Sequence, residues 1–462
     1  MRDIIEDNKK AEVMGRFSNG GSITSSLTLS DFTLRNHKKG ITALRIIKMP
    51  SVSKVSVLLS GDSDGLFVIW DLVTKRPITC TQIKDHPHII AFQWVGSTVL
   101  SILCKDSMLR MFKLEASALL STDLVVGERQ FNKTTGLQWA QIYEMPVNTL
   151  NFANFIMDSQ VELKDGKDNE SYRLICCHTN DSEAIDIYQI MQDPKFKLQR
   201  PFDNINFPEF LKKQSLLEIF NVPKDSKFGI IMKLAKLNDI IFLGFENGFI
   251  MGFTTTFDEE LQKGVADLIH ISNDHYPNPI LNMCISGDEL YSCSTDGFIS
   301  KHKFSIDLLT RPAAEYIKDD TLLIKCSSTL KASRPSRIDL PLKNISHIDV
   351  ISDDYLVVSN WSGKTIVINE YTSEVLQTFV KTRNNLVAND SSIGDLTNGN
   401  NSNTESSLKS KNYKVGSMIG LKSFDVQSDG LKVGELRRIK TLAKFSWCII
   451  GYDDGTIKLN RL

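Results

Sequence analysis

Two short segments of the chain bring together residue types that can do chemistry. The segment DHPH at 85–88 places two imidazoles at positions i and i+2, from which both rings can face one metal ion. No cysteine or further histidine stands at ligand spacing from them, so we interpret the segment as a loop that leads into a strand. The segment CCH at 176–178 combines thiols with a base, but neighbouring residues of a strand point to opposite faces. We therefore expect these cysteines to pack in the core.

Sequence signatures of the common enzyme classes are absent from the chain. It contains no GxSxG, no HExxH, no glycine-rich phosphate loop that ends in lysine and no EF-hand series. An active site needs several reactive groups that converge. The sequence therefore predicts a protein without a reaction, a metal ion or a cofactor of its own.

The composition indicates an ordinary globular protein. Apolar residues make up 41% of the chain and charged residues 24%. Because 54 Lys and Arg face 55 Asp and Glu, the net charge is −1, and no overall field attracts nucleic acid or anionic lipid. The eight cysteines are scattered without a CxxC, as in a reducing compartment. Acidic residues near the N-terminus argue against a secretion signal there. Charged residues interrupt the most apolar stretch, so we expect no membrane-spanning segment.

A β-hairpin repeats along the chain. It is clearest in VSVLLSGDSDGLFVIWDLVTKRP, where an apolar run, a turn and a second alternating run follow one another. Gly65 supplies the positive φ that such a short turn needs. The further copies are IIFLGFENGFIMGF, LYSCSTDGFISKHKF, YLVVSNWSGKTIVIN, WCIIGYDDGTIKLN, VLSILCKDSMLRMFKL and YRLICCHTNDSEAIDIYQI. The turn residues that recur in them are Gly248, Asp296, Gly297, Gly363, Asp454 and Gly455.

Seven hairpins predict seven blades of a β-propeller. A short apolar run that fits an inner strand precedes most of them: ITALRII, HIIAFQW, VNTLNFA, FGIIMKL, ILNMCIS and ISHIDVI. Before the seventh hairpin, IKTLAKF fits less well. Three such strands and an outer fourth make a blade, and repetition around a ring leaves only short sheet edges. We predict an all-β, seven-bladed WD-repeat propeller with degenerate repeats.

Uneven spacing of the hairpins divides the chain further. Residues 1–25 are expected to form a flexible tail and residues 26–462 a single propeller. Insertions are predicted at about 192–227, where PEFLKKQSLLEIF fits a short helix, and at about 306–341. The loop 384–412 is so rich in Asn and Ser that we expect it to be disordered.

The two ends of the propeller are predicted to meet. The chain stops at Leu462, directly after the third strand of the seventh blade, so that blade lacks an outer strand from its own end. The segment Ser26–Arg35 precedes the first inner strand and can supply the missing one. Such an N-terminal strand would close the open edge of the ring.

The first blade carries a polar set that resembles the structural tetrad of WD-repeat propellers. In that tetrad a loop histidine bonds a turn aspartate and a strand serine, and the indole N–H of a tryptophan completes the chain. The matching residues here are His37, Ser60, Asp64 and Trp70. In other blades the tryptophan position holds Phe112, Phe253, His302, Ile368 and Asn460, so we expect a single complete tetrad.

Three aromatic residues in the hairpin turns are candidates for binding a partner. Phe245, Trp361 and Tyr452 stand at one rim of the predicted ring, where the fold itself makes few demands. Exposed aromatic side chains are frequent anchors of protein interfaces. The alternative is that each ring packs across the neighbouring blade.

The strongest local basic feature is LRRIKTLAK, which includes Arg437 and Arg438. Some propellers bind phosphoinositides through an FRRG motif, but LRRI lacks its Phe and Gly. A lipid or nucleic-acid site and a solvated or partner-facing patch both remain open. A substrate receptor of a ubiquitin ligase is a further alternative, although such receptors carry Arg two residues after Trp-Asp and this chain has Val73 there.

Most of the chain resembles one family, the ASTRA-associated protein 1 family of fungal WD-repeat proteins. The resemblance rests on SLTLSDFTLRNHKKGITAL, LVTKRPIT, CKDSMLRMF, LNFANFIM, SNDHYPNPIL, ELYSCSTDGFISKH, the Asn/Ser-rich insertion and VGELRRIKTLAKFSWCIIGYDDGTIKLN. It implies a nuclear, non-catalytic subunit of the ASTRA complex with a role in chromatin regulation and in maturation of phosphatidylinositol-kinase-like proteins. The partners it implies are a kinase-like pseudokinase, RuvB-like AAA+ ATPases and the TTT co-chaperone.

Overall fold

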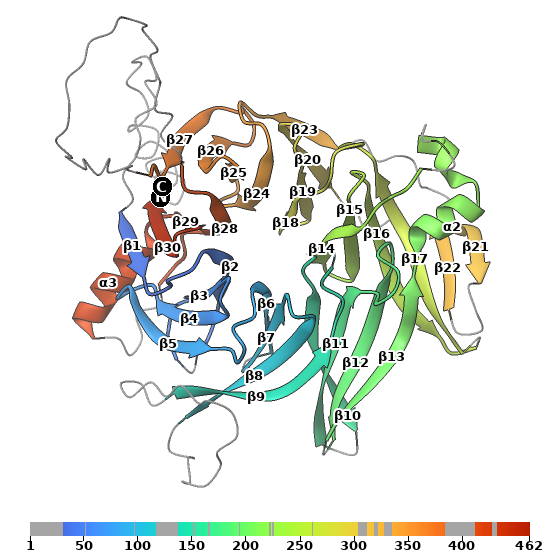
Figure 1. The fold of residues 1–462 in the computed structure, drawn as a ribbon, viewed down its shortest axis with the longest axis horizontal. Coiled ribbons are helices and arrows are strands. Elements are labelled where there is room, and N and C mark those ends of the chain that lie inside the picture. Colours follow the sequence, from blue (N-terminus) through green and yellow to red (C-terminus); the bar gives the residue numbers. More distant parts are fainter. Residues whose placement is uncertain are drawn as a thin grey trace, which may run out of the picture.

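Seven β-sheets stand around a common centre in the computed structural model of the protein (Figure 1). The structure describes residues 31–50, 52–96, 98–116, 137–150, 153–164, 167–193, 195–220, 223, 226–260, 262–303, 312–317, 322–327, 335–383, 412–426 and 432–462. In each sheet four strands run antiparallel from the centre outward. This arrangement confirms the seven-bladed β-propeller.

The first four blades follow one another in chain order. From inner to outer strand, blade one comprises β2 (Ile41–Ile47), β3 (Val57–Asp62), β4 (Leu66–Asp71) and β5 (Arg76–Gln82). Blade two comprises β6 (Ile89–Val95), β7 (Val99–Cys104), β8 (Met108–Ala116) and β9 (Leu137–Pro146). Blade three comprises β10 (Ile156–Lys164), β11 (Lys167–Cys177), β12 (Ile185–Asp193) and β13 (Lys195–Ile205). Blade four comprises β14 (Ile231–Leu237), β15 (Ile240–Phe245), β16 (Ile250–Asp258) and β17 (Lys263–Ser272).

The last three blades complete the ring. Blade five comprises β18 (Asn282–Ser286), β19 (Glu289–Cys293), β20 (Phe298–Lys303) and β23 (Ser336–Asp339). Blade six comprises β24 (Ile345–Val350), β25 (Tyr355–Asn360), β26 (Lys364–Asn369) and β27 (Val375–Val380). Blade seven comprises β28 (Val415–Leu421), β29 (Trp447–Tyr452), β30 (Thr456–Arg461) and β1 (Phe32–Arg35).

The N-terminal strand β1 closes the ring, as predicted. It pairs with β30 antiparallel, from Phe32 opposite Leu459 to Arg35 opposite Thr456, and Figure 1 shows the two strands side by side. Leu34 of β1 is 3% exposed and joins the core between blades seven and one. The predicted strand also included residues 26–30, which lie outside the described residues.

The hairpin turns have the backbone that the repeat predicted. The turn residues Gly65, Gly248, Gly297, Gly363 and Gly455 have φ between 79° and 89°, and Ser107 takes the same place in blade two with φ 64°. A Cβ at Gly248 would lie 2.5 Å from the Asn278 carbonyl oxygen, so this turn requires glycine for space as well as for φ. The turn aspartate Asp454 accepts a hydrogen bond from the Thr456 backbone N–H at 3.2 Å.

The hydrophobic core is divided among the interfaces between neighbouring blades. One cluster of buried side chains lies at each of the seven interfaces, including that between blades seven and one. The cluster between blades three and four also takes in α2 (Phe207–Lys213) and the 3-10 helix η2 (Leu216–Phe220). Each sheet is therefore held on both faces, which makes the ring a rigid body.

Two of the predicted inner strands are wrong. In blade three VNTLNFA precedes the inner strand, which begins only at Ile156. In blade seven IKTLAKF belongs mostly to the helix α3 (Val433–Ala443), and the inner strand is β28, earlier in the chain. The apolar spacing of IKTLAKF fits a helix with one buried side as well as a strand, which explains the error.

The insertions are shorter than predicted. The range 192–227 includes β13, the outer strand of blade three, so the insertion begins after Ile205, where Asn206 caps α2 by accepting from the Glu209 N–H at 2.7 Å. The range 306–341 includes β23 of blade five, and β21 (Pro312–Ile317) and β22 (Leu322–Ser327) extend the sheet of blade four through a parallel pairing with β17. The tail 1–25 and residues 384–411 of the Asn/Ser-rich loop lie outside the described residues.

Candidate functional site

The tetrad of blade one exists, but its acid is Asp62 and not Asp64. His37 Nδ1 lies 2.9 Å from Asp62 Oδ2 and His37 Nε2 lies 2.7 Å from Ser60 Oγ, to which Trp70 Nε1 donates at 2.8 Å. Ser60 and Asp62 lie two residues apart on β3 and therefore face the same side of the sheet. Asp64 stands in the turn beyond the strand.

Blade five contains a second network of the same form. His275 Nδ1 lies 2.7 Å from Asp296 Oδ2, and its Nε2 lies 3.0 Å from Ser292 Oγ. His302 Nε2 lies 3.3 Å from the same hydroxyl, at the position that Trp70 occupies in blade one. The expectation of a single complete tetrad was therefore wrong. The sequence pattern that could have identified the second network is a loop histidine before the inner strand, followed in the next hairpin by Ser and Asp four residues apart.

Two of the three candidate aromatics are part of the core. Phe245 is fully buried with Phe228 and Phe249 between blades three and four, and Tyr452 is 1% exposed between blades six and seven. The expectation that they face a partner was wrong, because each ring packs across the neighbouring blade. Trp361 is 52% exposed in the turn between β25 and β26.

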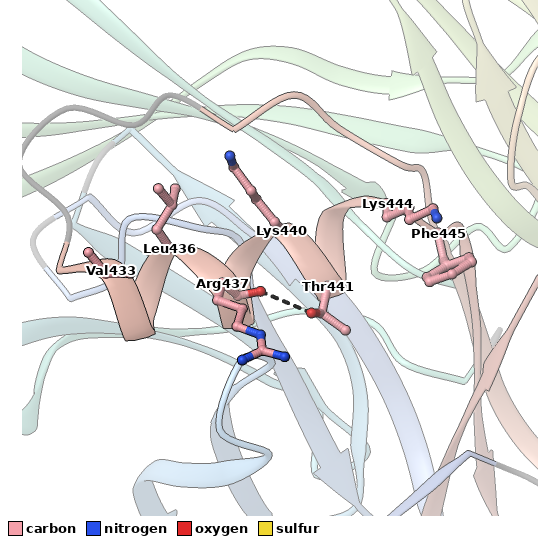
Figure 2. Close-up of a pocket in the computed structure, with 7 residues that line it drawn as sticks. All are labelled: Val433, Leu436, Arg437, Lys440, Thr441, Lys444 and Phe445. Carbon is pink, nitrogen blue, oxygen red and sulfur yellow. Dashed lines mark hydrogen bonds between the residues drawn. The ribbon is translucent and has the colours of Figure 1, made fainter. Parts of the chain in front are cut away.

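The basic segment lies on the helix α3. Arg437 and Arg438 are exposed, and Arg438 Nε donates to the Gly434 carbonyl within the same helix at 3.2 Å. Figure 2 shows Arg437 with Lys440 and Lys444 around a cavity of about 490 Å³ on the helix surface. The arginines therefore sit on an added helix and not on a strand of a blade.

A second cavity of about 550 Å³ lies at the centre of the ring, lined by the inner strands of six blades. Its charges are of both signs. Lys236 forms an ion pair with Asp158 across the cavity wall. Asp349 accepts from the Gly420 backbone N–H at 2.7 Å, and burial raises the pKa of this carboxyl to about 6. Arg45 faces the same cavity, where burial lowers its pKa and the charge of Asp349 opposes that shift.

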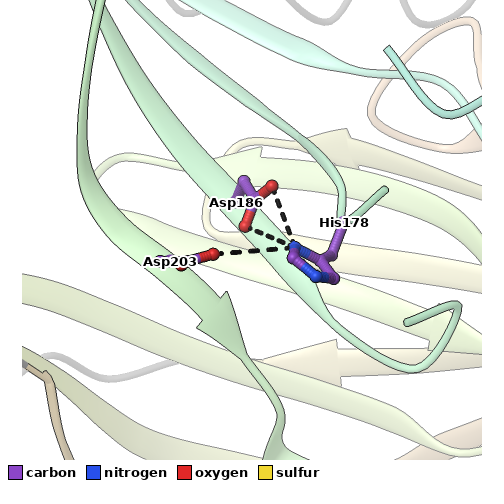
Figure 3. A group of neighbouring side chains, drawn as sticks. All are labelled: His178, Asp186 and Asp203. Carbon is purple, nitrogen blue, oxygen red and sulfur yellow. Dashed lines mark hydrogen bonds and ion pairs between the residues drawn. The ribbon is translucent and has the colours of Figure 1, made fainter. Parts of the chain in front are cut away.

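Among the described residues, metal-ligating side chains converge at His178, Asp186 and Asp203 in blade three (Figure 3). His178 Nδ1 lies 2.9 Å from Asp186 Oδ1, and Asp186 also accepts from Tyr188 Oη and the Asn204 backbone N–H. This carboxylate already has its full set of donors. The group therefore links β12 to β13, and a cation would have to displace the hydrogen bonds that Asp186 already accepts.

The DHPH and CCH segments, which combine reactive residue types, form structural contacts. Cys176 packs between blades two and three and Cys177 between blades three and four, which confirms their opposite orientation. Burial raises the pKa of the Cys176 thiol well above its usual value, the reverse of an activated nucleophile. His86 bonds Asp64 at the exposed surface over 3.3 Å. All eight cysteines are free.

Among the described residues, none of the helices has the length and hydropathy of a transmembrane span.

Known proteins resemble the chain along nearly its whole length. A family model described as ASTRA-associated protein 1 matches residues 30–460. A protein of that name from Saccharomyces cerevisiae is 66% identical over 450 residues, which cover 97% of this chain and 100% of that protein. Another from Zygosaccharomyces rouxii is 34% identical over 440 residues, which cover 94% and 99%.

Two solved structures are similar at much lower identity. The β-propeller domain of Cps50 (Swd1) from Myceliophteria thermophila matches with a TM-score of 0.48 and 11% identity over 93% of this chain and 98% of that one. Sqt1 from Saccharomyces cerevisiae matches with a TM-score of 0.46 and 10% identity over 95% and 98%.

Proposed function

This chain belongs to the ASTRA-associated protein 1 family, and on that premise we propose that it is a non-catalytic scaffold subunit of the nuclear ASTRA complex. Its role is to mediate protein–protein contacts in chromatin regulation and in maturation of phosphatidylinositol-kinase-like proteins. Its partners in this proposal are a kinase-like pseudokinase, RuvB-like AAA+ ATPases and the TTT co-chaperone. The chain acts as one copy within this hetero-complex.

The observation that carries the proposal is the family match, which spans 97% of the chain and the whole of the relative at 66% identity. The fold supports it physically. A closed ring with a packed core at every blade interface offers a large surface of fixed shape, and binding to a preorganised surface costs little conformational entropy. In blade one the buried polar side chains His37, Ser60, Asp62 and Trp70 bond one another, so the fold itself uses them.

Purification of the tagged chain from separated nuclear and cytoplasmic fractions tests the assembly. The recovered proteins are quantified by mass spectrometry against an untagged strain. We expect the pseudokinase, the RuvB-like ATPases and the TTT co-chaperone to be enriched together from the nuclear fraction. Recovery of the intact chain without any of these three would refute the proposal.

Depletion of the chain tests the role in maturation. The steady-state amounts of phosphatidylinositol-kinase-like proteins should fall while their transcripts stay constant, because the proposed defect lies in assembly after synthesis. Unchanged protein amounts after complete depletion would contradict this part of the proposal and leave membership of the complex untouched.

Trp361 is a proposed contact of this scaffold with a partner. Its indole is exposed at the rim formed by the turns between second and third strands. Tyr371 is the matched control, because it is also exposed and lies on the same blade in the turn between β26 and β27, at the opposite rim. We expect Trp361→Ala to reduce recovery of one partner and Tyr371→Ala to leave it unchanged. Equal recovery with both variants would exclude Trp361 as a contact.

A further inference from the structure

The helix α3 is an additional element of blade seven. It lies between β28 and β29 in the chain. The four strands β28, β29, β30 and β1 form the sheet of this blade without the helix (Figure 1). Ile439, Leu442 and Ala443 are buried on its inner side, and Trp447 Nε1 donates to the Leu442 carbonyl at 2.9 Å. The helix is thus fixed on the ring by one side. Its other side faces solvent.

The outer side of α3 carries a stripe of mostly basic residues. The α3 stripe consists of Val433, Arg437, Lys440, Thr441 and Lys444. Residues three and four positions apart lie next to each other on a helix, so these five follow one side of it. Together with Leu436 and Phe445 they line the cavity of about 490 Å³ (Figure 2). The cavity is therefore lined by apolar side chains at both ends and by the three cationic side chains between them.

The cations of the α3 stripe lack acidic partners in the described part of the chain. The Arg437 carbonyl accepts from Thr441 Oγ1 at 2.9 Å, but the guanidinium itself forms neither a hydrogen bond nor an ion pair there. Lys440 Nζ likewise has none, and Lys444 Nζ lies 5.5 Å from the centroid of the Phe445 ring. The exposed side of α3 thus carries three positive charges that no acidic side chain in the described part of the chain neutralises.

Stability of the helix explains only part of this arrangement. Cations near the C-terminus interact favourably with the helix dipole, and Lys440 and Lys444 occupy that end. Arg437 lies in the middle of the helix. At the other end Val433 is 85% exposed, directly after Lys432, whose side chain forms no capping hydrogen bond. The helix dipole therefore accounts for Lys440 and Lys444, whereas Arg437 and Val433 are exposed at the surface where a partner can contact them.

The pattern selects the class of partner. Nucleic acid is held through many phosphate contacts, whereas the α3 stripe offers three cations. A membrane surface requires large apolar residues that insert, whereas the apolar residue of the α3 stripe is Val433, which is 85% exposed. An acidic peptide requires only a few cations at helical spacing with apolar pockets between them.

We infer that the α3 stripe is a docking surface for an acidic segment of a partner protein, which places carboxylates on Arg437, Lys440 and Lys444 and an apolar side chain between Val433 and Leu436. This inference deepens the proposed function, since it assigns one surface of the scaffold and the chemistry of the segment it holds. The contact lies at the outer edge of the ring, away from the turns that carry Trp361.

Photo-crosslinking in cells tests the inference. A benzophenone amino acid replaces Thr441 in the full chain, and the same amino acid at Lys195 on β13 of blade three serves as the control. After irradiation the chain is purified under denaturing conditions, and crosslinked peptides are sequenced by mass spectrometry. We expect position 441 to crosslink to one peptide with an excess of Asp and Glu.

Charge-matched variants then test the chemistry. Arg437→Gln with Lys440→Gln removes two charges of the α3 stripe, and Lys195→Gln with Lys197→Gln removes two exposed charges from β13. The α3 double variant loses two surface ion pairs with the partner, so the yield of the position 441 crosslink should fall about fivefold. The β13 double variant should leave this yield unchanged. Val433→Ser should also lower the yield, because the apolar contact is lost.

The outcomes separate this inference from the proposed function. No crosslink above the Lys195 control, or a crosslinked peptide without acidic residues, would overturn the docking surface even if the complex is recovered. Binding of the purified chain to phosphoinositide-containing vesicles or to duplex DNA, lost in the α3 double variant, would assign the surface to lipid or nucleic acid instead. Because crosslinks form in cells, an acidic crosslinked peptide supports the surface even if the three proposed partners are absent.

Discussion

Replacement of Asp62 should cost far more stability than replacement of Asp64, although the two acids lie two residues apart. Asp62 is 1% exposed in its side chain and accepts from His37 Nδ1 at 2.9 Å and from the backbone N–H groups of Asp64 and Leu66 at 2.9 and 3.0 Å. The Asp64 side chain forms one ion pair, with His86 Nδ1 at 3.3 Å, and both side chains are more than two-fifths exposed.

The magnitudes follow from these contacts. Asp62→Ala leaves the buried His37 without its acceptor and two partly buried amides unbonded, which should lower the free energy of unfolding by about 3 kcal/mol. Asp64→Ala removes a surface pair and should cost less than about 0.5 kcal/mol. Asp62→Asn keeps an acceptor for the amides but removes the charge, so its loss should lie between the two.

Urea denaturation measures the difference, followed in parallel by tryptophan fluorescence and circular dichroism to establish that the transitions coincide. Trp70→Phe adds a test of the network, because its cost should be smaller in the Asp62→Ala background than alone if the residues act as a unit. Equal losses for Asp62→Ala and Asp64→Ala, or a larger loss for the second, would refute the assignment of Asp62.

Three further predictions concern other blades. Ser292→Ala should destabilise blade five by about 1–2 kcal/mol through loss of the second network, seen as faster amide exchange in β18–β20 with blade one unaffected. Burial lowers the pKa of His270 to about 4, so the stability it contributes is complete above its unfolded pKa of about 6.5 and is lost as pH falls toward 4. At about pH 5 this loss is about 2 kcal/mol, and unfolding curves across pH should show that His270→Phe removes it. Deletion of residues 1–35 should expose the edge of β30, and sedimentation should then detect self-association that the full chain does not show.

The sequence predicted the hairpins because their determinants are local. A turn glycine and alternating apolar residues fix a hairpin within about fifteen residues, and Gly65, Gly297 and Gly455 all have the predicted positive φ. The hairpin with Ser107 in place of glycine was also found, since the alternation on both sides of it was sufficient. The pairing of β1 with blade seven was predicted by counting strands, because that blade lacked an outer strand from its own end.

Contacts between blades could not be predicted from the sequence in the same way. Phe245 and Tyr452 occur in turn regions where aromatics can be exposed, and only the packing of the neighbouring blade buries them. For α3 the sequence contained the basic residues but not their setting, because the spacing of IKTLAKF fits both a strand and a helix.

The number of blades, the closure by the N-terminus and the absence of known catalytic motifs could be read from residue order, because they depend on turns and runs of a few residues. Three other features required the folded chain: Asp62 completes the tetrad, His302 completes a second one, and Arg437 lies on an exposed helix. These features depend on which side of a strand or helix a residue occupies and on what lies opposite. In a strand, a one-residue change of register moves every side chain to the other face.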